Sequence, residues 1–476
     1  MFPELQTFVP DAEIHTLTQK QPPKFGHALK EYFALDPDYV NLNHGSYGSC
    51  PSSVMEFAFD LGRKIERNPD YFDRVAVKPM LAKIREQLAD FIGVKSSEVV
   101  IVHNASHGVN TVLWNIEWAP EDTIVITSTT YYAVDAAVKF IHDKAPHPSI
   151  SHFPLLHPTT KEDILRAWEA HMQALANSKR ASSDSDPNAK STTPGKIVAI
   201  IDTISSNPGI LNPWVNMVKI AKRYGALAVV DGAHSLGQEV DLKDKLREAD
   251  PDFFVSNAHK WLYAKRGAAV FYVPERNQGI VKASFPVSPY YVSPKDRQSP
   301  SDNFVVQHNM TATIDWSNFF TIPAALQFRA WLGGEAAINA YTHKLALEGG
   351  KRIAEILQTE MMYPDEDSGM ELSMVNVALP LPACGKVIGP GAGGEISKEE
   401  YAFQMKVQGL IQRKLLEERN LGPTRYYHNG RLWLRVSGQV WLEMEDFEKV
   451  GWGVKEVCEE VIEELQLEKL VPVKNQ

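Results

Sequence analysis

The chain has 476 residues, of which 44% are hydrophobic and 23% are charged, so it can bury a large core and should fold as roughly two or three domains. Its formal net charge of -10 argues against a general affinity for nucleic acid or anionic membranes and favours a small-molecule partner. Three scattered cysteines do not suggest a disulfide framework, and no secretion signal or long apolar run is evident, so we expect a cytoplasmic protein.

Residues 1–45 are rich in proline and charge, and we expect them to form an N-terminal arm over the large domain or over a partner subunit. Beyond this arm, short β-branched runs alternate with amphipathic stretches, which predicts an α/β fold with a mainly parallel sheet between helices. The runs are almost continuously hydrophobic, as expected for strands that are covered on both faces. They are residues 99–102, 123–127, 197–202, 226–230, 253–255 and 268–273.

Two stretches interrupt this pattern. Residues 177–195 contain no aromatic or large aliphatic side chain, so we expect a flexible surface insertion there. The glycine-rich residues 385–394 are interpreted as a linker loop, with a mobile lid as the alternative.

After residue 320 the pattern changes to long helices with few strands, which is typical of a smaller α+β domain. The helices are expected at about 321–358, 397–417 and 443–466. The large domain would then span residues 46–320, and the small C-terminal domain residues 321–476.

Asp231 and Lys260 each follow a predicted strand, at the edge of the sheet where α/β proteins bind their ligands. An acid that keeps a ring nitrogen protonated and an amine that forms a Schiff base are two groups that a pyridoxal phosphate enzyme needs. Apolar neighbours should desolvate Lys260, lower its pKa and make it nucleophilic. The pair therefore predicts a cofactor enzyme, although Asp231 by itself fits better as a cap of the next turn and a lone lysine is by default a surface residue.

Other residues at the same edge complete a candidate cofactor site. Ala105 and Ser106 lie in a small-residue turn before a helix, whose backbone N–H groups can bind a phosphate, although capping by Ser106 is the better explanation of this turn taken alone. His259 is a candidate donor to the phosphate and His234 a candidate partner of the ring hydroxyl, unless they are satisfied core histidines. Tyr131 could stack on the ring, with core packing as an equal alternative.

Arg435 lies in the middle of a predicted strand of the small domain, where a charge is costly unless it is paired. The α-carboxylate of an amino-acid substrate would satisfy it in a bidentate pair. His103 and His107 have the spacing of metal ligands on a helix, but no third ligand accompanies them, so we expect no metal site.

Seven ordered sequence blocks span most of the chain. They are 41–48 (NLNHGSYG), 104–110 (NASHGVN), 205–209 (SSNPG), 230–234 (VDGAH), 257–262 (NAHKWL, followed by RG at 266–267), 311–315 (TATID) and 435–437 (RVS). Together they resemble the class V aminotransferase family of fold-type I pyridoxal phosphate enzymes, which includes cysteine desulfurases, isopenicillin N epimerases and hercynylcysteine sulfoxide lyases. This resemblance implies a large domain with a seven-stranded, mainly parallel sheet and a smaller α+β domain.

The resemblance also implies how the cofactor is held. Lys260 would carry pyridoxal phosphate as a Schiff base and act as the catalytic residue. Asp231 would contact the ring nitrogen, His234 the ring oxygen, and Tyr131 the ring face. The phosphate contacts would be Ala105, Ser106 and His259.

The remaining assignments concern the substrate and the partner subunit. By the resemblance, Thr313 would reach the phosphate of the neighbouring subunit, which implies a homodimer with shared active sites. Arg435 would bind the substrate carboxylate, and we assign Asn43 and Tyr47 of the first block to substrate binding.

Within the family, the aromatic blocks 257–262, 269–274 and 439–447 look most similar to fungal hercynylcysteine sulfoxide lyases of ergothioneine synthesis. A cysteine desulfurase needs a nucleophilic cysteine shortly before the carboxylate arginine, but residues 418–434 contain none and Cys384 is too remote. The sequence therefore predicts a lyase that cleaves a carbon–sulfur bond of a cysteine conjugate or its sulfoxide by β-elimination. The alternatives are an amino-acid epimerase or alkaloid-forming cyclase, a desulfurase, or a catalytically silent protein on this fold.

Overall fold

The structure is a computed structural model that describes residue 17 and residues 19–184, 195–284, 291–296, 298, 304–309, 312–365, 368–382 and 397–467. The glycine-rich residues 385–394 lie outside the described residues, so the linker or lid expected there stays a prediction. The same holds for residues 185–194 of the expected insertion.

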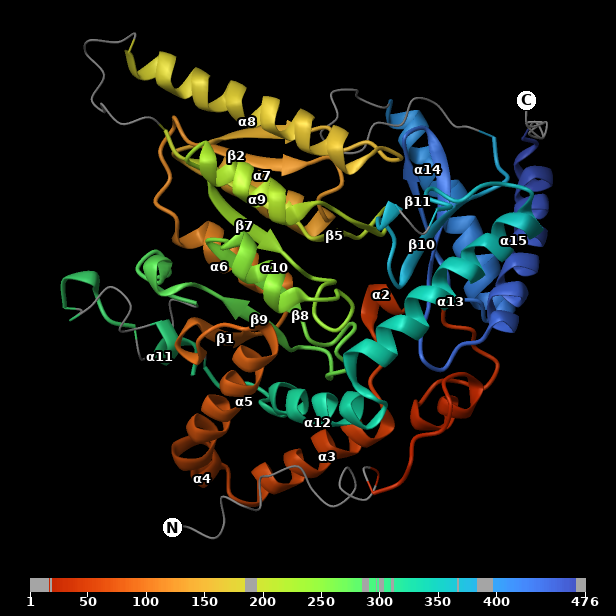
Figure 1. The fold of residues 1–476 in the computed structure, drawn as a ribbon, viewed down its shortest axis with the longest axis horizontal. Helices are drawn as coiled ribbons and strands as arrows, with labels where there is room; N and C mark the ends of the chain where they lie inside the picture. Colours follow the sequence, from red (N-terminus) through yellow and green to blue (C-terminus); the bar gives the residue numbers. More distant parts are fainter. Residues whose placement is uncertain are drawn as a thin grey trace.

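A seven-stranded sheet in the order β1-β9-β8-β7-β4-β2-β3 forms the centre of the molecule (Figure 1). The neighbours from β8 to β3 are parallel, whereas β9 is antiparallel to both β1 and β8. The strands are β1 Val99–Val102, β2 Thr123–Thr127, β3 Ser149–Phe153, β4 Ile197–Asp202, β7 Leu227–Asp231, β8 Phe253–Asn257 and β9 Ala269–Tyr272. The predicted α/β fold with a mainly parallel seven-stranded sheet is confirmed. The sequence pattern missed β3, because this edge strand keeps polar, partly exposed side chains.

Helices cover both faces of this sheet, which explains why its strands are almost continuously hydrophobic. The helices of this part are α2 His44–Tyr47, α3 Ser52–Arg67, α4 Pro69–Tyr71, α5 Val77–Ile92, α6 Ala105–Asn115, α7 Tyr132–Asp143, α8 Lys161–Asp184, α9 Trp214–Arg223, α10 Leu242–Ala249 and α11 Phe304–His308. Ala228 and Val230 of β7 pack in one core with α5, α8, α9 and α10. Val229 points to the opposite face, into a second core with α6, α7 and α11.

A three-stranded antiparallel sheet in the order β10-β12-β11 forms the C-terminal part, beside the large sheet (Figure 1). Its strands are β10 Met374–Ala378, β11 Thr424–His428 and β12 Arg431–Ser437. Its long helices are α12 Ser317–Trp331, α13 Gly334–Leu357, α14 Lys398–Gln412 and α15 Met444–Leu465. None of the helices in the described residues is long and apolar enough to cross a membrane.

Two expectations about helices are corrected. The single helix expected at 321–358 is two helices, because the chain turns at Gly333 and Gly334, whose φ values of 103° and 81° are readily adopted only by glycine. The expected insertion at 177–195 is partly helical, because α8 continues to Asp184 through residues with adequate helix propensity.

The described part of the N-terminal arm hydrogen-bonds to the C-terminal part of its own chain. Gly26 N donates to Val440 O at 2.8 Å, the His27 ring contacts Asp446 at 2.7 Å, and Val40 N donates to Asn420 O at 3.0 Å. The expected arm over the large domain or a partner subunit did not include these contacts. They join residues that are far apart in the sequence, such as His27 and Asp446, which are 419 positions apart.

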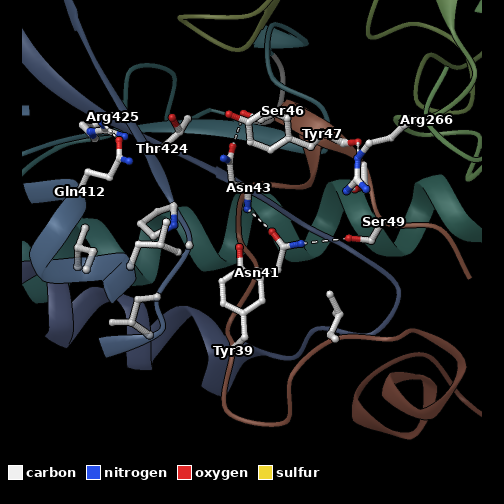
Figure 2. Close-up of a pocket in the computed structure, with 17 residues that line it drawn as sticks. Tyr39, Asn41, Asn43, Ser46, Tyr47, Ser49, Arg266, Gln412, Thr424 and Arg425 are labelled. Carbon is white, nitrogen blue, oxygen red and sulfur yellow. Dashed lines mark hydrogen bonds between the residues drawn. The ribbon is translucent and has the colours of Figure 1, made fainter. Parts of the chain in front are cut away.

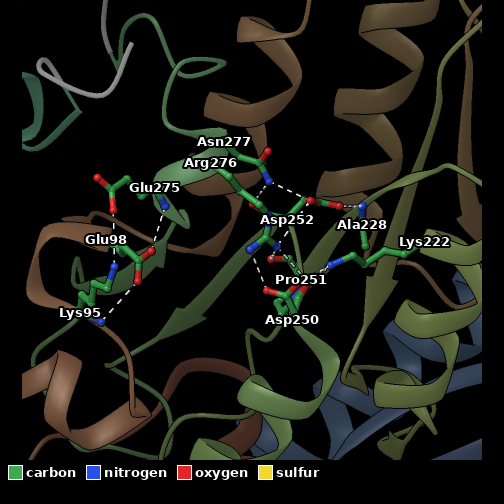
Figure 3. A network of polar contacts seen from close by, with 10 residues as sticks. All are labelled: Lys95, Glu98, Lys222, Ala228, Asp250, Pro251, Asp252, Glu275, Arg276 and Asn277. Atoms are coloured by element: carbon green, nitrogen blue, oxygen red, sulfur yellow. Dashed lines mark hydrogen bonds and ion pairs between the residues drawn. The ribbon is translucent and has the colours of Figure 1, made fainter. Parts of the chain in front are cut away.

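A polar network closes the end of the large sheet away from the strand carboxyl ends (Figure 3). Asp252, just before β8, accepts hydrogen bonds from Ala228 N and Asn277 Nδ2, both at 2.8 Å. Arg276 pairs with Asp250 at 2.8 Å, and Glu98 accepts from Glu275 N at 2.9 Å. These bonds tie the starts of β7 and β8 together, so the opposite end of the sheet is left to bind ligands.

Candidate active site

Lys260 lies in the tight turn after β8, held from the other side by the short helix α2. The Lys260 side chain is 8% exposed, and its backbone carbonyl contacts His44 Nε2 at 2.8 Å. Gly48 packs directly over this turn, since a Cβ there would lie 1.9 Å from the carbonyl oxygen of His259, and its φ is 69°. Only glycine fits this backbone approach, and the block 41–48 therefore serves to seat the lysine turn.

The amine of Lys260 contacts His234, with 3.1 Å between Nζ and Nε2. Trp261 donates its indole N–H to the other ring nitrogen, Nδ1, at 3.3 Å. Burial holds the pKa of His234 well below its usual range, so the ring is neutral and Nε2 carries its proton. Nε2–H can then donate only to an uncharged lysine. Burial, aided by the positive charge of Arg435, lowers the pKa of Lys260 to about 7, which makes that neutral amine accessible.

Two buried carboxyl groups lie at neighbouring strand ends. Asp231 ends β7 and Asp202 ends β4, and the two are register partners whose side chains leave the same face of the sheet. Asp231 accepts a hydrogen bond from Ala233 N at 3.0 Å, whereas Asp202 Oδ2 is buried and has no partner among the described residues. Burial raises the pKa of both groups, and the proximity of Asp231 raises that of Asp202 further. We missed Asp202 in the sequence, although it ends a strand run just as Asp231 does.

The candidate phosphate site is the N-terminus of α6, which begins at Ala105. Its cap is Asn104, whose side chain accepts a hydrogen bond from His107 N at 2.8 Å, and not Ser106, which is already inside the first turn. The expectation that Ser106 caps this helix is therefore wrong, because the extended backbone required of a cap falls on Asn104. Asn257, at the end of β8, accepts a hydrogen bond from Ala105 N at 2.9 Å and fixes the helix start beside Lys260.

Arg435 is the buried cation of the site, with 1% of its surface exposed. Its guanidinium donates to the backbone oxygen of Ser206 at 2.6 Å, to Asn43 Oδ1 at 2.9 Å and to Ser46 Oγ at 2.8 Å. All of these acceptors are uncharged, and Nε is buried without a partner among the described residues. Burial lowers the pKa of Arg435 to about 10, which still leaves it charged near neutral pH. A buried cation with a spare donor is suited to an anionic ligand such as a carboxylate.

The structure brings some of the other predicted residues to this cluster and not others. Tyr131 is half-buried at the start of α7, where Tyr47 and Arg435 both act on its hydroxyl electrostatically and burial raises its pKa. His259 contacts the carbonyl of Ala268 at 3.3 Å, and burial beside Lys260 lowers its pKa to about 4. Thr313 is exposed, and the described residues do not place it against the cluster.

These residues fit pyridoxal phosphate. A buried amine with a pKa of about 7, a buried carboxyl group at the adjacent strand end and a capped helix N-terminus lie at one edge of the sheet. They supply the groups that bind the aldehyde carbon, the ring nitrogen and the phosphate of this cofactor. The described residues contain no group of three or more His, Cys, Asp or Glu side chains that could hold a metal ion.

A cavity of about 290 Å³ is lined in part by Ser46 and Tyr47 of α2 (Figure 2). Asn43 and Ser46, which hold Arg435, also line this cavity, together with Arg266 and Arg425. The sequence carried no signal for it, because its walls come from segments that are remote in the chain.

The described cysteines do not supply a desulfurase nucleophile. Burial raises the pKa of Cys50 and of Cys458 to about 12, which keeps both as unreactive thiols. The loop at 418–423 lines the cavity with Leu421 and Gly422 and contains no cysteine. Cys384 lies outside the described residues.

Comparisons with known proteins show which family the chain belongs to. The family model of aminotransferase class V matches residues 74–155 and 161–381. The L-cysteine desulfhydrase-like protein lolT1 of Epichloe uncinata is 34% identical over 94% of this chain and 98% of the relative. The hercynylcysteine sulfoxide lyase of Schizosaccharomyces pombe is 28% identical over 91% of this chain and 98% of that protein.

Among solved structures, a C-DES mutant with glycine covalently linked to the PLP cofactor superposes with a TM-score of 0.68, at 15% identity, over 90% of this chain and 99% of that chain. At this identity the likeness shows the fold alone, which is that of the fold-type I pyridoxal phosphate enzymes. The family match and the relative at 34% identity are stronger evidence, and both cover more than half of the sequence. The chain therefore belongs to the class V aminotransferase family.

Proposed function

We propose that the protein is a pyridoxal phosphate-dependent lyase that cleaves the carbon–sulfur bond of a cysteine S-conjugate or its sulfoxide. The observation that carries this proposal is the buried pair of Lys260 and Arg435. Lys260 offers an amine with a pKa of about 7. Arg435 carries a positive charge, and the groups to which it donates hydrogen bonds are all neutral. An amine for the cofactor and a clamp for a carboxylate together define an amino-acid substrate. The relatives named for desulfhydrase and sulfoxide lyase activity support carbon–sulfur cleavage.

Each side chain has a distinct task in this reaction. Bound pyridoxal phosphate supplies the electron sink that makes the substrate Cα acidic. Arg435 binds the α-carboxylate through Nε, the donor that has no partner among the described residues, which orients the Cα–H bond. Lys260 Nζ takes the proton from Cα, and His234 keeps this amine neutral by donating Nε2–H to it. Asp231 supplies the negative charge that holds a protonated ring nitrogen.

The bonds balance without an external oxidant or reductant. The Cα–H bond breaks by loss of a proton, and the Cβ–S bond then breaks with its electron pair leaving on sulfur. The departing sulfur takes up a proton and becomes a thiol, or a sulfenic acid when the substrate is a sulfoxide. The remaining 2-aminoacrylate takes up water and yields pyruvate and ammonium.

The decisive measurement follows pyruvate and sulfur products from an S-substituted cysteine and its sulfoxide. We expect both products in equal amounts, and we expect Lys260→Ala to lower kcat by at least about 10³-fold, because it removes the proton acceptor. Borohydride treatment of the protein loaded with cofactor should place the label on Lys260 alone. A product that retains its Cβ substituent would instead indicate epimerisation or cyclisation, for which the site offers no specific support.

The finer assignments belong to the same proposal. We infer a homodimer in which the exposed Thr313 meets the phosphate of the neighbouring subunit, and a cytoplasmic enzyme that acts in an ergothioneine-type pathway. The site roles of Ala105, Ser106, Tyr131 and His259, and the division into an arm of residues 1–45, a large domain and a small domain, are part of this proposal. The resemblance in the sequence blocks and the positions of these residues support it.

A further inference from the structure

The cavity beside α2 is walled by three parts of the chain that the fold brings together (Figure 2). The first wall is the segment from Leu35 to Ser49, which ends in α2. The second runs from Gln412 to Arg425 and includes the loop before β11. Arg266, from the loop after Lys260, closes the third side and donates hydrogen bonds to Gly48 O at 2.8 Å and to Tyr47 O at 3.1 Å. At about 290 Å³, the cavity can hold a small organic group.

The cavity reaches the carboxylate clamp through shared side chains. Asn43 and Ser46 line the cavity and also accept hydrogen bonds from Arg435. Thr424, another lining residue, lies directly opposite Arg435 in the β11–β12 ladder, so the two side chains leave the same face of that sheet. Tyr47 interacts electrostatically with both Arg435 and Arg425. A ligand held on Arg435 therefore lies next to this cavity.

The charge of the cavity is positive. Among the described residues, its lining includes Arg266 and Arg425 and no aspartate or glutamate, although the whole chain is acidic with a net charge of -10. Arg425 donates to the backbone oxygen of Gln408 at 3.1 Å and to the side-chain oxygen of Gln412. Both acceptors are neutral, and burial lowers the pKa of Arg425, as expected for a cation that no carboxylate of the described part of the chain pairs with. The apolar part of the lining is Leu35, Leu415, Leu416, Leu421 and Pro423.

We propose that this cavity is a side-chain subsite for the sulfur substituent of the substrate, and that Arg425 selects substituents that end in an anionic group such as a carboxylate. This inference rests on the proposed lyase function and adds the class of substrate. The leucines contact the methylene part of the substituent, and Arg425 pairs with its acidic end. Cysteine alone, which has no substituent, leaves this subsite empty.

The test compares three cysteine conjugates whose substituents differ in charge, the first two of them nearly equal in size. S-(2-carboxyethyl)-L-cysteine carries an acid, S-(2-carbamoylethyl)-L-cysteine is its neutral isostere, and S-(2-aminoethyl)-L-cysteine carries an amine. With the holoenzyme, we expect kcat/KM for pyruvate release to be at least about tenfold higher for the acid than for the amide, equivalent to about 1.4 kcal/mol, and lowest for the amine. Equal values for the acid and the amide would overturn the inference.

Variants test whether Arg425 is the residue that causes the preference for the acidic conjugate. Arg425→Gln should bring the ratio of acid to amide close to one, and Arg425→Lys should restore part of it, because the positive charge is retained. Arg431→Gln is the control, since Arg431 lies on the neighbouring strand β12 opposite His428, pairs with Glu360 and does not line the cavity. A ratio that survives Arg425→Gln, or that falls equally in Arg431→Gln, would contradict the assignment.

A binding measurement separates this inference from the proposed reaction. The Lys260→Ala protein, supplied with pyridoxal phosphate, is titrated calorimetrically with the acid and the amide. If the wild-type enzyme releases no pyruvate from any conjugate, the lyase proposal fails, yet tighter binding of the acid that depends on Arg425 still supports the subsite. Equal affinities for the two ligands would remove the subsite whether or not the lyase reaction occurs.

Discussion

The pKa of Lys260 is lowered to about 7 because burial desolvates the amine and the positive charge of Arg435 adds to this effect, while Asp231 opposes it. The neutral amine is the nucleophile, so its reaction with pyridoxal phosphate should follow this lowered pKa. In apoprotein treated with pyridoxal phosphate and borohydride, we expect labelling at Lys260 to rise with a midpoint near pH 7.

The control for this titration is Arg435→Gln, which removes the positive charge and should move the midpoint to higher pH. Peptide mapping after labelling at pH 6, 7, 8 and 9 gives the titration curve. A midpoint above pH 9 in the wild-type protein would show that the lysine is not desolvated as the structure has it.

Asp202 is a second residue whose environment makes a measurable prediction. Its folded-state pKa is raised by burial and by Asp231, so the folded protein binds more protons than the unfolded chain above pH 4. The contribution of Asp202 to the free energy of unfolding is therefore favourable at low pH and is lost as pH rises. In apoprotein, Asp202→Asn should increase the free energy of unfolding at pH 7 by about 1 kcal/mol or more and flatten its decline above pH 4.

Urea unfolding between pH 4 and 8 measures both effects. The control is Asp244→Asn, at an exposed position of α10, which should change the unfolding free energy by less than about 0.5 kcal/mol. If Asp202→Asn instead destabilises the apoprotein at pH 7, the hydrogen bond between Thr130 and the carboxyl group outweighs the cost of burying that group.

At the scale of elements, two glycines in helices separate the effect of side-chain packing on stability from the effect of helix propensity. Gly349 of α13 faces α15 so closely that a Cβ would lie 2.2 Å from the ring of Phe447, which is fully buried. Gly409 of α14 is exposed, and a Cβ there would have nothing within 4 Å. The close approach of α13 and α15 thus depends on the missing side chain of Gly349.

We expect Gly349→Ala to lower the free energy of unfolding by about 1–3 kcal/mol through overpacking, because the buried ring cannot move away without disturbing its neighbours. Gly409→Ala should raise it by about 0.5–1 kcal/mol, because alanine is the better helix former. Thermal unfolding of the two variants gives the comparison, and a shift of the same sign in both would mean that α13 and α15 do not pack as described.

At the scale of the whole molecule, the proposed dimer is tested by mass and by Thr313. Light scattering should give twice the chain mass of 53.3 kDa. Thr313→Val should weaken pyridoxal phosphate binding several-fold, because it removes a hydroxyl donor from the neighbouring phosphate. Thr160→Val is the control, since Thr160 lies just before α8, where its hydroxyl donates to the Asp163 carboxylate and accepts from the Asp163 backbone N–H. A monomer that binds the cofactor at full strength would exclude a shared site.

Local patterns determined much of the site. Hydrophobic runs with β-branched residues mark a buried parallel sheet, and polar residues that follow such runs lie at its carboxyl edge, so the positions of Asp231 and Lys260 at that edge could be predicted from the sequence. Where a pattern was ambiguous, the sequence failed: it placed the cap of α6 on Ser106 instead of Asn104, continued one helix through Gly333, and overlooked the polar edge strand β3.

The tertiary structure decided what depends on residues far apart in the chain. The neutral state of Lys260 needs His234, Trp261 and Arg435 in one buried cluster. The cavity needs segments near residues 40, 266 and 420 to meet, and the pairing of Asp202 with Asp231 needs two strands in register. The sequence by itself determined the elements and the chemistry they can carry, because both depend on local residue type and spacing. Only the fold decided which side chains are buried, which charged groups lie close together and what shape the cavity has, because these arise from contacts that no local pattern encodes.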